Sequence, residues 1–198
     1  MIHFQQATFL KSAAKVSQFP EDIGSEVAFV GRSNAGKSSA LNALTCQKKL
    51  ARVSGTPGRT QLINFFNLTE EVRLVDLPGY GYAAVPKAVK NAWHVLIDKY
   101  LTTRKSLKGL VLLMDIRHPL QTFEQEVLEW CSKSHLLVHV LLTKADKLSN
   151  SAARTQLDKV AQQMEQYGEV ASIQLFSAIK KRGIEELREK LSKWLLDL

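Results

Sequence analysis

One short run of residues has the composition of a phosphate-binding loop. It reads Gly31-Arg32-Ser33-Asn34-Ala35-Gly36-Lys37-Ser38 and fits the pattern G-x-x-x-x-G-K-S/T. Its glycines allow the backbone to turn successive N–H groups toward phosphate oxygens, and a helix that follows adds the positive end of its dipole. We therefore expect Lys37 to reach the β- and γ-phosphates of a nucleotide and the Ser38 hydroxyl to bind Mg²⁺.

A second phosphate element is the run Asp76-Leu77-Pro78-Gly79, which begins 38 residues after Ser38 and follows an expected strand. Asp76 is placed to hold Mg²⁺ through water, and the Gly79 backbone N–H to meet the γ-phosphate. Between the two elements lies a basic loop in which Thr60, with Thr56 as the alternative, could close over the metal. Thr60 is favoured because it stands beside the strand that would anchor it. Three residues are thus expected to act at the γ-phosphate: Lys37, Thr60 and Gly79.

Two further runs could recognise a base. Thr143-Lys144-Ala145-Asp146 follows an expected strand, and the Asp146 carboxylate could accept parallel hydrogen bonds from the N1–H and amino group of guanine, a pair that adenine lacks. Phe176-Ser177-Ala178 follows the last expected strand, and its backbone N–H groups could bond the guanine O6. Alone, either run could be a capping loop or a turn. Their order after the two phosphate elements favours guanine-nucleotide binding.

The elements that must position these runs alternate along the chain in the manner of βα units. Short apolar runs predict six strands, at residues 27–30, 62–68, 72–75, 110–114, 136–142 and 173–176. Helical periodicity predicts five helices, at residues 37–45, 87–102, 122–133, 152–167 and 184–198. Because only three residues separate the second and third strands, these two should form an antiparallel hairpin. We expect an α/β P-loop fold: a six-stranded mixed sheet with one antiparallel strand and helices on both faces.

Length and composition suit one globular domain. The 198 residues are 45% hydrophobic, and we expect residues 1–24 to be a lead-in packed on a domain formed by residues 25–198. No stretch is long and apolar enough to span a membrane, and the first 25 residues lack the order of a signal peptide. The two cysteines, Cys46 and Cys131, lie far apart without a partner motif. We expect a cytoplasmic monomer with no membrane partner.

The chain is basic, with 27 Lys and Arg against 19 Asp and Glu and a net charge of +8. One basic cluster lies in residues 48–59 and a second in residues 87–108, where Asp98 is the only acidic residue. A solvated surface and an RNA partner both account for such clusters.

These motifs, in this order, resemble the translation-factor-related small GTPases, and their wording resembles the EngB GTPases of bacteria. The resemblance covers essentially the whole chain, including the lead-in Phe9-Leu10-Lys11-Ser12-Ala13. It rests on the phosphate loop extended to Ser39, on Thr56-Pro57-Gly58-Arg59-Thr60-Gln61 with Asn64-Phe65, on Asp76-Leu77-Pro78-Gly79-Tyr80-Gly81-Tyr82 and on Thr143-Lys144-Ala145-Asp146.

The resemblance implies a Ras-like G domain and a Mg²⁺-dependent GTPase. It further implies a role in assembly of the large (50S) ribosomal subunit, through rRNA and ribosomal proteins, and a link to cell division and septation. Ser38 and Thr60 would be the metal ligands. The nucleotide would be surrounded by Gly31–Ser38, Gly58-Arg59-Thr60-Gln61-Leu62, Asp76–Gly79, Thr143–Asp146 and Phe176–Ala178. Asparagine is usual at the position of Thr143 in Ras-like proteins, so the base contact expected there is in question.

The residue after Gly79 bears on hydrolysis. Ras-like enzymes orient the attacking water with a glutamine there, and this chain has Tyr80, which predicts a low intrinsic rate of GTP hydrolysis. Asn34 could coordinate K⁺, as in some related GTPases, or only shape the loop. Arg59 could contact RNA or serve as an internal arginine finger. Two other functions remain open: a nucleotide-gated RNA- or protein-binding module with negligible hydrolysis, and an ATP-using P-loop kinase.

Overall fold

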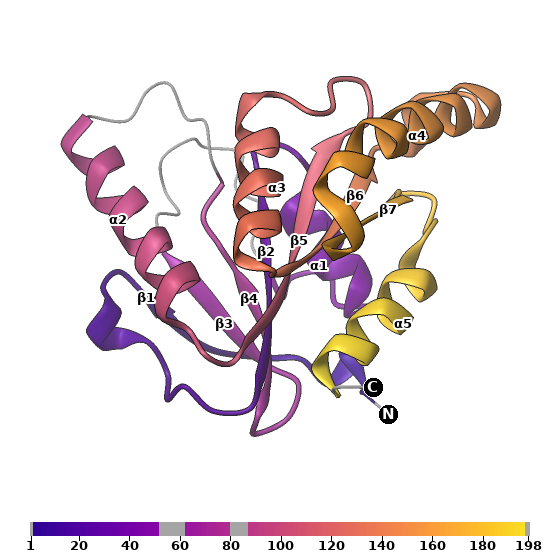
Figure 1. The fold of residues 1–198 in the computed structure, drawn as a ribbon. Coiled ribbons are helices and arrows are strands. Elements are labelled where there is room, and N and C mark those ends of the chain that lie inside the picture. The colour runs from indigo at the N-terminus through magenta and orange to yellow at the C-terminus, as the bar shows by residue number, and fades with distance from the viewer. Residues whose placement is uncertain (1, 52–61, 80–86, 197–198) are drawn as a thin grey trace.

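The computed structural model describes residues 2–51, 62–79 and 87–196, with the backbone alone for residues 87–93. It is an α/β fold in which helices cover both faces of one sheet (Figure 1). The strands are β1 Thr8–Ala13, β2 Ser25–Gly31, β3 Ile63–Asn67, β4 Val72–Asp76, β5 Leu107–Asp115, β6 Leu137–Thr143 and β7 Ala171–Leu175. The α-helices are α1 Lys37–Leu44, α2 Lys87–Thr103, α3 Thr122–Ser134, α4 Asn150–Met164 and α5 Ile184–Leu195.

The sheet has the order β1-β3-β4-β2-β5-β6-β7. Strands β4, β2, β5, β6 and β7 pair in parallel, whereas β3 pairs antiparallel with both of its neighbours. The predicted hairpin is therefore confirmed, and β3 is the strand that runs against the rest. Helices α2, α3 and α4 lie over one face of the sheet, and α1 and α5 over the other (Figure 1).

The prediction of six strands was wrong by one, because residues 8–13 form a seventh strand, which is the outermost strand of the sheet beside β3. Strand β1 pairs with β3 from Thr8 opposite Asn67 to Ala13 opposite Ile63, with an irregularity between Phe9 and Lys11. Phe9 is 57% exposed, so the apolar residues of this segment do not follow the alternation that marks a half-buried strand. Its pairing depends on the free edge of β3, which no local pattern reveals.

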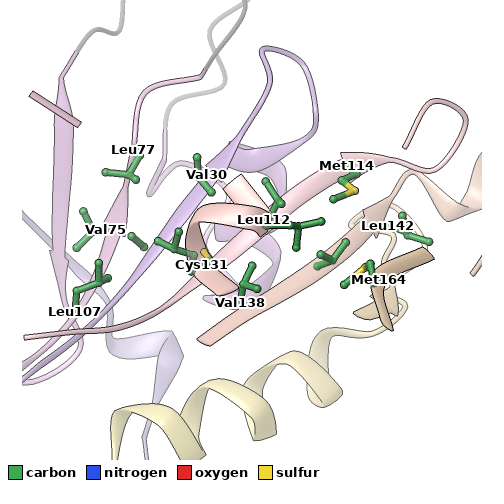
Figure 2. Close-up of a cluster of buried hydrophobic side chains, with 14 of the residues drawn as sticks. Val30, Val75, Leu77, Leu107, Leu112, Met114, Cys131, Val138, Leu142 and Met164 are labelled. Atoms are coloured by element: carbon green, nitrogen blue, oxygen red, sulfur yellow. The ribbon is translucent and has the colours of Figure 1, made fainter. Parts of the chain in front are cut away.

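Two hydrophobic cores fill the space on either side of the sheet. One lies under α2, α3 and α4 and includes Val30, Leu112, Val138 and Cys131 (Figure 2). The other lies under α1 and α5 and joins Phe29 and Leu41 to α5. As its period predicts, α5 buries one stripe of side chains, and the buried members are Ile184, Leu187, Leu191 and Leu195.

Helix α4 differs from its expected bounds at both ends. The helix begins at Asn150 because Ser149 caps it, with the Ser149 hydroxyl accepting a hydrogen bond from the Ala152 N–H at 3.2 Å. It ends at Met164, and the chain continues as a 3₁₀ segment over Glu165–Val170 in which Gly168 has a φ of 72°. Helix α5 ends at Leu195, short of the expected residue 198.

A buried carboxylate organises the end of the sheet at which the parallel strands begin. Glu26 is fully buried and accepts hydrogen bonds from Arg104 at 2.6 and 2.9 Å, from Arg73 at 3.1 Å and from the Tyr100 hydroxyl at 3.0 Å. The basic cluster inferred for residues 87–108 is therefore not wholly a solvated surface. Its Arg104 is paired with Glu26, which lies 78 positions away in the chain, and no local sequence pattern links the two residues.

A buried histidine in β6 is held by two polar neighbours. The His139 ring lies 2.8 Å through Nδ1 from the Ser172 hydroxyl and 2.8 Å through Nε2 from the Gln174 Oε1. Burial lowers the pKa of His139 from 6.5 to about 4, so the folded protein holds this ring neutral at neutral pH.

The unfolded chain takes up a proton on this histidine near pH 6.5, and the folded chain only near pH 4. The free energy of unfolding should therefore fall as the pH drops through this interval, by up to about 1.4 kcal/mol per pH unit. Urea titrations of the wild type and His139→Asn between pH 7.5 and 4.5 measure this contribution as the difference in slope. Parallel curves for the two proteins would contradict it.

Candidate functional site

The predicted binding runs lie at one edge of the sheet, where five parallel strands end. The register pairs Gly31 of β2 with Leu113 of β5, and Phe29 with Asp76 of β4. Further along the same edge, Asp115 of β5 pairs with Thr143 of β6. Because the carboxyl ends of parallel strands meet at this edge, the two phosphate elements and the two base elements converge there.

The loop between β2 and α1 has the backbone conformation that its sequence suggests. Gly36 directly precedes α1 with a φ of 95°, and Asn34 has a φ of 65°, both in the left-handed region. Gly31 lies so close to β5 that a Cβ there would come to 3.0 Å from the Leu113 carbonyl oxygen. Glycine is required at both ends of the loop for these reasons, and asparagine is among the residues that tolerate the conformation at position 34.

The two phosphate elements are in direct contact. Lys37 forms an ion pair with Asp76, and both side chains are largely buried. A Cβ added to Gly79 would lie 3.4 Å from the Cα of Ser33, so the Gly79 backbone lies against the phosphate loop. Lys37, the first residue of α1, and Asp76, the last residue of β4, therefore meet at the sheet edge, and Ser38 follows Lys37 in the first turn of α1. Hydroxyl and carboxylate oxygens are the donors that Mg²⁺ prefers.

Thr143 joins the base element to the phosphate loop. Its buried hydroxyl lies 2.6 Å from the Ala35 carbonyl oxygen and 3.0 Å from that of Met114 in β5. The sequence put a base contact by this residue in question, and in the structure its hydroxyl binds the protein backbone instead. Thr143 holds the two loops at a fixed separation.

The two base elements are also bonded to each other. The Ser177 hydroxyl donates to the Asp146 Oδ1 at 2.5 Å, and the Ala145 N–H donates to the Phe176 carbonyl oxygen at 3.1 Å. Ser177 is buried, whereas Asp146 is partly exposed. One carboxylate oxygen of Asp146 is therefore oriented by the protein, which presents the group in a fixed direction.

Sequence reasoning missed Asp115 and Arg117, which adjoin Lys144. The Asp115 Oδ2 lies 2.9 Å from the Lys144 Nζ and 2.6 Å from the Arg117 guanidinium, and this guanidinium together with the ammonium holds the pKa of Asp115 well below its usual range. Lys144 itself has a φ of 57°. Asp115 directly follows the strand expected at residues 110–114, as Thr143 follows the strand expected at residues 136–142, and this shared position could have identified it from the sequence.

The remaining predicted residues occupy different environments. The side chains of Leu77 and Ala145 lie in one core, and those of Ala35 and Phe176 in the other. Leu62 is 36% exposed just before β3, and Arg32 is exposed in the loop. Gly58, Arg59, Thr60, Gln61 and Tyr80 lie outside the described residues. Within the described ranges, no group of three or more His, Cys, Asp or Glu side chains could hold a metal ion.

Replacing Thr143 with valine removes both hydroxyl contacts and leaves two buried carbonyl oxygens with fewer partners. We expect Thr143→Val to lower the free energy of unfolding by about 1–3 kcal/mol and to weaken nucleotide binding. Thr143→Ser keeps the hydroxyl and serves as the matched control. Urea titration and displacement of a fluorescent guanine nucleotide measure the two effects. Wild-type stability and nucleotide affinity in Thr143→Val would contradict this role of the hydroxyl.

Comparison with known proteins identifies the fold and the family. The family model described as "50S ribosome-binding GTPase" matches residues 26–144. The chain is 54% identical over 191 residues to the probable GTP-binding protein EngB of Coxiella burnetii, covering 96% of this chain and 93% of that protein. The corresponding Salmonella newport protein is 52% identical over 197 residues, covering 100% and 94%. A crystal structure of a probable EngB superposes with a TM-score of 0.69 at 21% identity, covering 88% and 100%. By sequence over nearly its full length and by fold, this chain belongs to the EngB family of GTP-binding proteins.

Proposed function

We propose that this protein is a GTPase of low intrinsic rate that controls, through its bound nucleotide, a step in assembly of the large (50S) ribosomal subunit. The observation that carries the nucleotide part is the contact of Thr143 with the phosphate loop, which sets the base element and the phosphate element at one fixed spacing. Such a site fits a ligand that has a base and a phosphate chain together.

The residues divide between the two ends of the nucleotide. Lys37, the loop backbone from Gly31 to Ser38 and the Gly79 N–H would hold phosphates, with Lys37 exchanging its Asp76 contact for them. Asp146 would accept from the guanine N1–H and amino group, while Phe176–Ala178 would present N–H groups to O6. Rejection of adenine follows because a base without this donor pair leaves the carboxylate unpaired.

Ser38 and Thr60 would bind Mg²⁺ directly, with Asp76 acting through water. The metal would neutralise charge on the β- and γ-phosphates during hydrolysis. The contact between Asp76 and Lys37 supports this assignment, because it brings the carboxylate to the start of α1, where Ser38 stands. Loss of the γ-phosphate would release Thr60 and Gly79, and this is the proposed switch.

Tyr80 in place of glutamine supports slow hydrolysis, and Asn34 is the proposed ligand for K⁺. Asn34 is exposed, and its left-handed backbone also suits a purely loop-shaping role. If K⁺ is used, single-turnover phosphate release from Mg²⁺–GTP should be several-fold faster in KCl than in NaCl at equal ionic strength. Asn34→Gly keeps the backbone conformation available and should abolish the difference. Equal wild-type rates in the two salts would exclude K⁺.

Three observations support the ribosomal role. The matching family model describes ribosome-binding GTPases, the relatives are EngB proteins over nearly their whole length, and the chain carries a net charge of +8. RNA attracts such a surface electrostatically.

We further propose a monomeric cytoplasmic protein of one domain, with residues 1–24 as its lead-in, and a connection to cell division and septation. Among the described residues, no helix is long and apolar enough to cross a membrane.

Co-sedimentation tests the assembly role. Purified large subunits, small subunits and protein are mixed in GTP, in GDP and without nucleotide, and the pelleted protein is measured. We expect binding to large subunits that depends on the nucleotide, since γ-phosphate contacts set the loop conformation. Lys37→Ala should lose the nucleotide dependence, whereas Lys159→Ala, on the exposed face of α4, should retain it. Equal binding to both subunits in all three states would refute the role.

A further inference from the structure

A rigid turn next to the base element displays three consecutive cations. After Phe176, backbone hydrogen bonds of 3.1 and 3.0 Å join Ser177 and Arg182 in both directions, and the Lys180 N–H donates to the Ser177 hydroxyl at 3.1 Å. Lys181 is held at a φ of 53°, a left-handed conformation that lysine adopts at some cost. We name Lys180, Lys181 and Arg182 the basic turn. Its side chains are exposed on a backbone that is already fixed.

The cations of the basic turn form no ion pair with any residue that the structure describes. Among the described residues no carboxylate lies within ion-pair distance of these three side chains, although other surface cations are paired, as Lys133 is with Glu129 and Arg154 with Asp158. The Arg182 guanidinium makes only a long contact, 3.3 Å to the Asn150 Oδ1. Three uncompensated cations in a row favour a polyanionic partner.

A cavity of about 360 Å³ lies against this turn. Its lining includes Lys180 and Arg182 of the turn, and Ser149 and Asn150 at the start of α4. Ala145, Asp146 and Ser177 of the two base elements also line it, and no residue of the phosphate loop does, so this cavity adjoins the base elements. Asp146 is its one acidic lining residue. In the nucleotide-bound protein the guanine donors would occupy that carboxylate, which leaves cations, an amide and a hydroxyl to face an incoming anion.

We propose that the basic turn and this cavity form a docking surface for the phosphate backbone of RNA, a role that rests on the proposed function and locates part of its contact with the ribosomal subunit. Phosphate suits this lining because it combines a guanidinium and an ammonium from one turn with an amide N–H₂ and a hydroxyl from the start of α4. Every residue of this surface lies in the described part of the chain.

The test compares two charge-matched variants, loaded with GDP. Lys180→Gln/Lys181→Gln/Arg182→Gln removes the basic turn, and Lys15→Gln/Lys159→Gln/Lys193→Gln removes three exposed cations elsewhere. Binding of protein-free large-subunit rRNA is measured by filter retention at several KCl concentrations. We expect the first variant to bind about tenfold or more weakly at 0.1 M salt and its log–log salt slope to fall by about 2, because each phosphate contact on single-stranded RNA contributes about 0.7. The control should keep wild-type affinity within about twofold.

Displacement of a fluorescent guanine nucleotide should give the same GDP affinity for both variants and the wild type, which shows that the turn keeps its backbone. Equal weakening of RNA binding in both variants would make the effect general charge and overturn the proposal. Wild-type RNA binding by the first variant, with loss of large-subunit co-sedimentation, would assign the turn to a ribosomal protein and also overturn it. If the wild type itself binds no large subunits, the proposed function fails, whereas unchanged subunit and RNA binding by the first variant removes only the docking surface.

Discussion

Parallel pairing of five strands is the constraint on which the rest of this molecule depends. Strands β4, β2, β5, β6 and β7 each form backbone hydrogen bonds with a neighbour that runs in the same direction, so their carboxyl ends meet at one edge. The register then fixes which residues meet: Gly31 with Leu113, and Asp115 with Thr143. Runs that lie more than 100 residues apart in the chain are thereby brought together at one edge.

Side-chain hydrogen bonds convert this convergence into a site of defined geometry. Thr143 bonds the phosphate loop and β5 at once, and Ser177 bonds Asp146. Loops at a sheet edge would otherwise be free to vary, because their backbone groups can bond water equally well. Burial strengthens the two contacts of the Thr143 hydroxyl, since their partners have no water as an alternative. The cores reinforce the effect by holding Ala145 on one face of the sheet and Phe176 on the other.

The two ends of the sheet use charge in different ways. At the end remote from the site, Glu26 is sealed among Arg73, Arg104 and Tyr100, and the cluster fixes the residues that follow α2 to the sheet. At the site end, the ion pairs are less completely buried: the side chains are 12% and 11% exposed in Lys37 and Asp76, and 32% and 18% exposed in Lys144 and Asp115. Breaking a sealed pair leaves a buried charge, whereas accessible groups can exchange partners at smaller cost.

The sequence alone determined the local features of this protein. The phosphate loop needs glycine at fixed positions, the hairpin of β3 and β4 follows from a short connection, and α5 is predicted by the helical period of its apolar residues. These features follow from backbone conformation and short-range spacing, which the local sequence specifies. Only the tertiary structure decided that residues 8–13 form a strand, that Arg104 is buried against Glu26 and that Asp115 adjoins Lys144. Thr143 belongs with these, because its hydroxyl could have faced a base and instead binds Ala35. In each case the deciding partner lies far along the chain, and pairing across such distances is set by the packing of the whole sheet, which leaves no local pattern to read.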